Sequence, residues 1–173
     1  MGCVYVGCAC LVGLVFAVSA VSKFRDFGGF VGSVPHLVPM PTGWARPTAV
    51  LVVAAETSVP VLVAVPPPGA LGFGVAAALL IAFTVAIATA LRRDRRSSCR
   101  CFGASDVPLG TRHLVRNGVL LAVALAGAAT TGPGGFADPP PLAGALIAGV
   151  AGLIGALLII TLDDIVDLFA RTA

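Results

Sequence analysis

Five long apolar runs divide this chain of 173 residues, and they constrain its fold more than any other feature. A bilayer core takes a helix of roughly 20 apolar residues. Only 11% of the residues are charged and the mean hydropathy is +1.02, whereas a soluble domain carries roughly 25% charged residues. The sequence therefore predicts an all-α bundle of membrane helices, built as a single domain over residues 1–173. The predicted spans are residues 3–22, 48–65, 69–91, 114–131 and 142–162.

The fourth span is the weakest of these predictions. Arg116 and Asn117 stand at its entry, so its uncharged part is short for a full crossing. The second span is also short, and Pro60 interrupts it. The longer connections are expected at residues 23–47 and 92–113, and the short connections at 66–68 and 132–141 each contain three consecutive prolines.

The placement of positive charge predicts an orientation. With five crossings, all 11 lysines and arginines fall on one side of the membrane, and the positive-inside rule makes that side cytoplasmic. We therefore expect a multi-pass protein of the plasma membrane with its N-terminus outside and its C-terminus in the cytoplasm. Lys23, Arg25 and Arg46 belong to the first inner connection, where Trp44 is placed as an interfacial anchor would be.

Small residues recur every fourth position along the fifth span. Such a stripe allows two helix backbones to approach closely in lipid. We expect this stripe to pack inside the bundle, and dimerisation is the alternative. The stripe consists of Gly144, Ala148, Gly152 and Ala156.

Cys99 and Cys101 form a C-x-C pair beside a run of arginines. A disulfide between two cysteines this close is strained and therefore labile. Neighbouring arginines, Arg100 among them, stabilise the reactive thiolate, and Gly103 permits a tight turn. The residues themselves leave three readings open: reactive thiols, a metal site with His113 and the remote His36, or no special role.

Glu56 lies in the middle of the second span. A carboxylate there is costly to bury, so it should face the bundle interior and be protonated or paired. It could handle protons or bind a quinone, or it could be a structural acid that hydrogen-bonds a neighbouring helix. No metal-ligand set is predicted, and a quinone is the one cofactor left open.

Three further cysteines, Cys3, Cys8 and Cys10, begin the first span near the expected outer face. Cysteine in a membrane helix is usually a small apolar filler. The alternative is a set of outer-face thiols that exchange with exported proteins.

These motifs together resemble the methylamine-utilisation MauE family, within the wider DoxX-like membrane proteins. The resemblance covers about residues 5–130 and leaves the fifth span outside. It rests on Ser22-Lys23-Phe24-Arg25-Asp26, Glu56, Cys99-Arg100-Cys101-Phe102-Gly103 and Arg116-Asn117, which recur in that order.

The resemblance implies a four-helix core, with Cys99 and Cys101 as the redox element and Glu56 as the intramembrane acid. It also implies a role in maturing the disulfide-rich small subunit of methylamine dehydrogenase. The expected function is thiol–disulfide maturation of exported proteins, which would make the chain an oxidoreductase with a thioredoxin-like or exported partner. The alternative is a non-enzymatic assembly factor or small-molecule carrier. The bilayer is an expected partner, and a nucleic acid is not.

Overall fold

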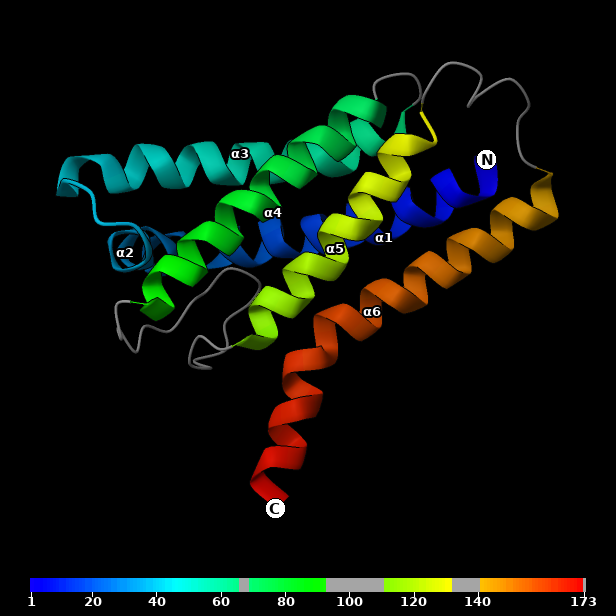
Figure 1. The fold of residues 1–173 in the computed structure, drawn as a ribbon. Coiled ribbons are helices and arrows are strands. Elements are labelled where there is room, and N and C mark those ends of the chain that lie inside the picture. Colours follow the sequence, from blue (N-terminus) through cyan, green and yellow to red (C-terminus); the bar gives the residue numbers. More distant parts are fainter. Residues whose placement is uncertain (66–68, 93–110, 132–140, 173) are drawn as a thin grey trace.

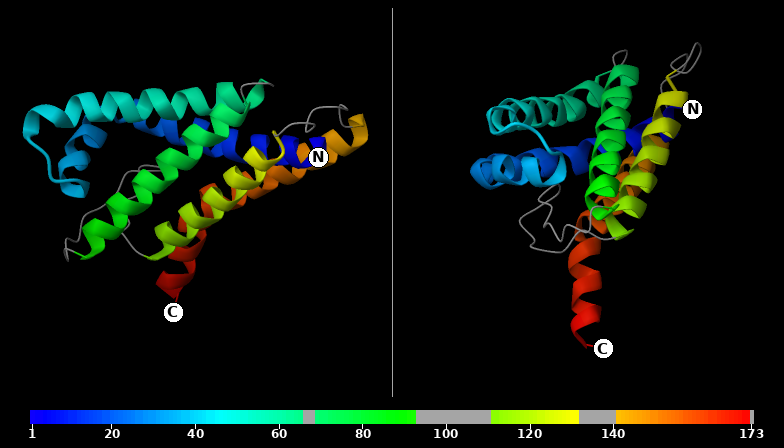
Figure 2. Two further views of the ribbon diagram at one scale, coloured as in Figure 1. Left: turned by 45° about the horizontal axis from the view of Figure 1, so that its top comes forward. Right: turned by 60° about the vertical axis from the view of Figure 1, so that its left-hand side comes forward.

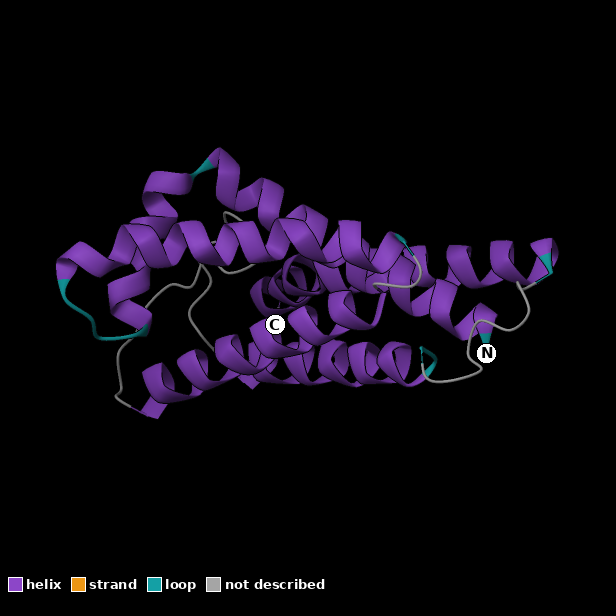
Figure 3. Cartoon of the chain, turned by 90° about the horizontal axis from the view of Figure 1, so that it is seen from above, coloured by secondary structure: helices purple, strands orange, loops and turns teal. Residues whose placement is uncertain are grey.

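The computed structural model describes residues 1–65, 69–92, 111–131 and 141–172, and these ranges are almost wholly helical (Figures 1 and 3). No strand occurs in them, which confirms the predicted all-α class. The elements are α1 (Gly2–Arg25), α2 (Phe27–Leu37), η1 (Thr42–Trp44), α3 (Ala45–Ala64), α4 (Gly69–Arg92), α5 (Thr111–Ala129) and α6 (Leu142–Thr172).

Four of the described helices are long and apolar enough to cross a membrane: α1, α3, α4 and the Leu142–Thr161 part of α6. Helix α5, which contains the predicted fourth span, is not among them. Its 19 residues begin with a polar turn that includes Arg112, and Arg116 and Asn117 follow within the next turn. These side chains lower the mean hydropathy of α5. The described residues therefore contain four candidate membrane spans and not the five that the sequence predicts.

Close contacts fix the direction in which each helix runs. Helices α1 and α3 are antiparallel, because Tyr5 lies beside Val63 and Ser19 beside Glu56. Helices α4 and α5 are also antiparallel, since Gly127 packs against the ring of Phe73.

In contrast, α6 runs parallel to α1, beginning beside Cys3 and passing Leu11 further along (Figure 1). Its 31 residues exceed a bilayer crossing, and its last part projects away from the other helices (Figure 2).

The stripe of small residues on α6 packs inside the bundle, as expected. A Cβ added at Gly152 would lie 2.5 Å from the carbonyl oxygen of Gly7, and one at Gly144 would lie 2.9 Å from the sulfur of Cys3. Ala156 is fully buried. The absence of larger side chains is what lets α6 lie directly on the backbone of α1.

Residues 23–47 are not the loop that the sequence predicted. Helix α1 continues through Lys23 to Arg25, and a second helix, α2, follows at once. The side chain of Asp26 caps α2 by accepting a hydrogen bond of 3.0 Å from the N–H of Gly29. Figure 1 shows α2 turned across the end of α1.

An apolar side of α2 is buried against the bundle. Phe30 and Val34 pack with Ala49 and Val53 of α3, and Leu37 packs with residues of α4. With 11 residues, α2 is too short to cross a bilayer. It closes the end of the bundle where α1 finishes.

Candidate functional site

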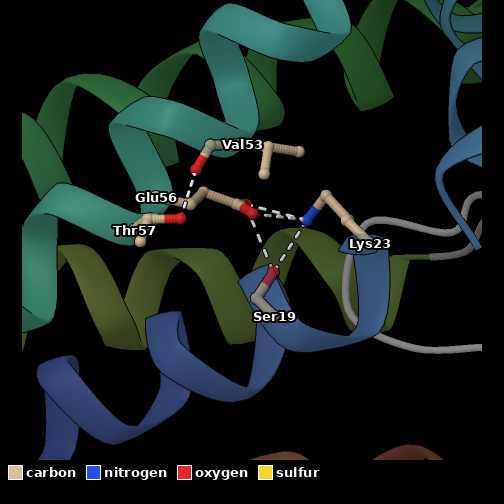
Figure 4. A network of polar contacts seen from close by, with 5 residues as sticks. All are labelled: Ser19, Lys23, Val53, Glu56 and Thr57. Carbon is tan, nitrogen blue, oxygen red and sulfur yellow. Dashed lines mark hydrogen bonds and ion pairs between the residues drawn. The ribbon is translucent and has the colours of Figure 1, made fainter. Parts of the chain in front are cut away.

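An ion pair is buried where α1, α2, α3 and α4 meet. The Lys23 Nζ donates to both carboxylate oxygens of Glu56, at 2.8 Å and 2.9 Å, and to the Ser19 hydroxyl at 2.7 Å. The Ser19 hydroxyl in turn donates to Glu56 Oε1 at 3.2 Å (Figure 4). Lys23 is 2% exposed and Glu56 is 0% exposed. We call Ser19, Lys23 and Glu56 the polar cluster.

Helical spacing brings the polar cluster together. Ser19 and Lys23 are four residues apart on α1, so both side chains lie on the same face of that helix. Glu56 projects from the middle of α3 toward this face. A carboxylate and an ammonium are each costly to bury alone, and pairing removes the net charge. The three N–H groups of Lys23 are matched by three acceptor contacts, so its hydrogen-bonding capacity is used in full.

Two aromatic rings extend the cluster to the other helices. The Lys23 Nζ lies 5.3 Å from the ring centre of Phe30 on α2 and 5.5 Å from that of Phe83 on α4. Both distances fall within the range of cation–π attraction. One ammonium group therefore contacts side chains from three helices besides its own.

The beginning of α5 adds two further buried polar residues. Arg116 is 3% exposed and Asn117 is 2% exposed, and the charge of Arg116 acts on Lys23. Within the described residues, the amide nitrogen of Asn117 has no hydrogen-bond partner. An unsatisfied buried donor costs about 1–3 kcal/mol.

Pro60 modifies α3 one turn beyond Glu56. Proline has no N–H, so the backbone carbonyl of Glu56 lacks its usual partner four residues later. Thr57 does not fill this role, because its hydroxyl donates to the carbonyl of Val53 at 2.7 Å (Figure 4). Pro60 therefore removes one backbone hydrogen bond from α3 close to the polar cluster.

Chemically, the cluster can act as a clamp or as a proton relay. An ammonium, a hydroxyl and a carboxylate within hydrogen-bond distance form a short chain along which a proton can move. The same contacts also join α1 to α3 inside the bundle. The expected interior position of Glu56 agrees with its burial and pairing, and its chemical role stays a prediction.

Lys23 is the site residue that the sequence reasoning missed. It was assigned to a connecting loop as one of the charges that set orientation, whereas it lies inside α1 and points into the bundle. Two signals could have identified it. Ser19 and Lys23 share a helical spacing, and a basic residue at the end of the first span is a candidate partner for an acid in the middle of the second.

The predicted redox residues Cys99, Arg100, Cys101 and Gly103 lie outside the described residues. Within the described part, no group of three or more His, Cys, Asp or Glu residues is arranged to hold a metal ion.

The three cysteines of α1 are free thiols. The sulfur of Cys3 lies against Gly144, Cys10 lies beside Gly149 and Gly152, and Cys8 packs on the core. Cys3 and Cys8 are partly buried, whereas Cys10 is exposed, and the role of these thiols stays a prediction.

Comparisons with known proteins point to one family. The family described as methylamine utilisation protein MauE matches residues 1–130, which include α1 to α5. A relative from Paracoccus denitrificans, the methylamine utilization protein MauE, is 34% identical over 115 residues. That match covers 65% of this chain and 62% of the relative, so the chain spans less than two thirds of the relative's length. No solved structure matches the chain.

Proposed function

The chain belongs to the methylamine utilisation protein MauE family, and from this premise we propose that it supports thiol–disulfide maturation of exported proteins. The observation that carries the proposal is that the family match spans residues 1–130. It includes both the Cys99/Cys101 pair and every residue of the polar cluster. In the relative, the name itself links the protein to methylamine utilisation.

The proposed chemistry is thiol–disulfide exchange at Cys99 and Cys101. One protein's dithiol becomes a disulfide as the other protein's disulfide becomes a dithiol, which transfers two electrons and two protons. The reactive form is the thiolate, and the arginines around the pair, including Arg100, favour it. Gly103 allows the tight turn that presents the pair. The partner is a thioredoxin-like or an exported disulfide-containing protein.

We further propose five crossings, with the N-terminus outside and the C-terminus in the cytoplasm. Helix α6 begins at the same end of the bundle as α1, whereas α4 finishes at the opposite end. The chain must therefore return between them, and α5 runs in the required direction. Arg25, Arg46 and Arg92 lie where α1 and α4 end and α3 begins, which makes that end cytoplasmic.

This orientation places Cys99 and Cys101 at the cytoplasmic face. A bilayer core of about 30 Å then separates the pair from exported proteins. A membrane-soluble electron carrier is needed to connect the two sides.

Membrane-impermeant maleimide tests the pair and its sidedness together. We expect Cys99 and Cys101 to react only in inverted vesicles, and more strongly after mild reduction. Labelling from right-side-out vesicles would reverse the proposed orientation. If mild reduction does not change the maleimide labelling of Cys99 and Cys101, this result would count against a redox pair.

Serine variants test the function itself. Cys99→Ser and Cys101→Ser should each abolish disulfide formation in the exported partner while the protein stays in the membrane. Cys8→Ser is the matched control, since Cys8 packs on the core, and it should keep full activity. Full activity in the Cys99→Ser/Cys101→Ser variant would contradict the proposal.

One observation favours a second candidate, a non-enzymatic assembly factor or small-molecule carrier. The polar cluster ties α1 to α3 without any cysteine. In this reading, Glu56 and the Pro60 break line a path through the bundle. Uptake into vesicles that is lost in Glu56→Gln but kept in the double serine variant would support the carrier.

A further inference from the structure

Polar side chains occupy one face of α5 in its first half. His113, Arg116 and Asn117 are spaced by three and four residues, so they lie on the same face of the helix. Burial increases along this face, because His113 is partly buried whereas Arg116 and Asn117 are buried. Leu120, about one turn further on, is apolar and fully buried. We call His113, Arg116 and Asn117 the α5 strip.

The buried end of the α5 strip lies beside the polar cluster. Gly127 packs on Phe73, so the later part of α5 lies at the level of the early part of α4. The first turns of α5 therefore lie toward Phe83, whose ring is near the Lys23 ammonium. The charge of Arg116 acts on Lys23, in agreement with this register.

Apolar side chains enclose the polar cluster on its other sides. The rings of Phe30 on α2 and Phe83 on α4 lie over the Lys23 ammonium. Toward the beginning of α1, the side chains packed beyond Ser19 are apolar and fully buried, and they come from three helices. They are Val12, Val15, Phe16, Val59 and Leu80. Among the described residues, the α5 strip is therefore the polar approach to the cluster.

Asn117 supplies the observation that points to a ligand in the strip. Its side chain is 2% exposed, and its amide nitrogen has no hydrogen-bond partner among the described residues. Buried amide donors are almost always hydrogen-bonded to protein or to ordered water. A water molecule suits this place, because it accepts a hydrogen bond from the amide and donates to a neighbouring polar group.

We propose that the α5 strip is a proton path between water at the end of the bundle and the Lys23–Glu56 pair. Water held along the strip gives one proton to the pair and takes another from it, so exchange leaves the charge of the cluster unchanged. The apolar side chains beyond Ser19 end the path there, so protons enter and leave at one face of the membrane. The path needs no cysteine, so the inference goes beyond the proposed function and does not rest on it.

The composition of the chain makes this exchange measurable. Lys23 is its only lysine, so isotopically labelled lysine reports one ammonium group and one backbone amide without any assignment. NMR of the full chain in nanodiscs, with transfer of magnetisation from water, measures how fast the protons of each group exchange. We expect the ammonium to exchange far faster than the amide, which is held in α1. An ammonium no faster than the amide would overturn the path, because protons would then enter only when the bundle opens.

Asn117→Leu interrupts the strip at its buried end. We expect exchange of the ammonium to slow at least about 10-fold, which corresponds to about 1.4 kcal/mol in the barrier. The rate of the Lys23 amide should stay the same. Unchanged ammonium exchange would overturn the path. Equal slowing of the ammonium and the amide would also overturn it, because the variant would then act through the stability of the bundle.

Asn117→Ser tests whether a polar group at this position is what matters. Serine keeps a hydroxyl and leaves room for water, so this variant should restore most of the exchange that Asn117→Leu loses. A serine variant as slow as the leucine variant would overturn the role assigned to Asn117.

Thr130→Val is the matched control at the opposite end of α5. Thr130 is buried, and its hydroxyl donates to the carbonyl of Gly127 at 2.6 Å. Valine has nearly the same shape, and the exchange of the Lys23 ammonium should not change. Slowing equal to that in Asn117→Leu would overturn the assigned entrance.

Proteoliposomes that contain a pH-sensitive dye test the closed side of the path. We expect no proton leak above that of empty liposomes, because the apolar side chains beyond Ser19 separate the cluster from the other face. A leak that Asn117→Leu removes would show that the path crosses the membrane, and it would overturn access from one face.

Discussion

The two halves of α1 hold their neighbours in different ways. The first half packs on α6 through small residues, with Gly7 against Gly152 and Cys3 against Gly144. The second half holds α3 through the hydrogen bonds and charges of Lys23 and Glu56. One contact is apolar and depends on shape, and the other is polar and depends on charge.

The difference follows from the bilayer as solvent. Lipid tails are as apolar as leucine, so helices gain little by exchanging lipid contacts for contacts with one another. Close packing at small residues and hydrogen bonds between helices are the two remaining sources of association. Close packing dominates the first half of α1, where Tyr5 adds one hydrogen bond to α3, and the buried ion pair dominates the second half. Each half can therefore be tested by its own variants.

The largest effect is expected at the polar cluster. Glu56→Leu leaves the Lys23 ammonium buried without its carboxylate, which should lower the free energy of unfolding by about 3–5 kcal/mol. Unfolding in mixed detergent–SDS micelles, followed by circular dichroism, measures this loss.

The double variant shows whether the loss comes from the pair. Lys23→Met/Glu56→Leu removes both charges, so it should recover most of the stability lost in Glu56→Leu. If the stability lost in the double variant equals the sum of the losses in Glu56→Leu and Lys23→Met, the two residues act independently.

A smaller effect is expected at the α1–α6 contact. In Gly152→Ala the new methyl group meets the backbone oxygen of Gly7, so α6 must move away from α1. We expect a loss of about 1–3 kcal/mol, measured in the same unfolding assay.

Gly74 supplies the matched control for this contact. It lies in α4, and a Cβ there meets no atom within 4 Å. Gly74→Ala should therefore be neutral or stabilising by up to about 1 kcal/mol, because alanine favours helix. If Gly74→Ala and Gly152→Ala change the free energy of unfolding equally, close packing does not hold α6 against α1.

The smallest effect is expected at Tyr5, in the half of α1 that packs on α6. Its hydroxyl donates to the carbonyl of Val63 at 2.8 Å, near the end of α3. Tyr5→Phe keeps the edge-on contact with Phe73 and removes only this hydrogen bond. We expect a loss of about 0.5–1.5 kcal/mol. A larger loss would show that polar bonds matter in both halves of α1.

Much of the fold followed from the apolar runs. Four of the five expected spans correspond to helices able to cross a membrane, with small shifts at their ends. Helix α3, for example, begins at Ala45 rather than at residue 48, because η1 leads directly into it. The runs predict helices reliably because a backbone in lipid must satisfy its own hydrogen bonds.

The connection at residues 23–47 was the main structural error. The sequence predicts a loop there, yet α2 forms because its apolar side has a surface to cover. Helices of this length depend on tertiary packing more than on intrinsic propensity. The packing surface belongs to α3 and α4, so the local sequence does not reveal it.

The apolar runs and the position of Glu56 are enough to predict a helical membrane protein in which this acid is buried with compensation. These predictions follow from the cost of placing charges and unpaired backbone groups in lipid. The packing of the helices was needed to show that Lys23 compensates Glu56 and that Phe30 of α2 covers the Lys23 ammonium. Partners 33 residues apart meet only when the crossing of α1 and α3 is fixed, and that crossing depends on the fit of many side chains at once.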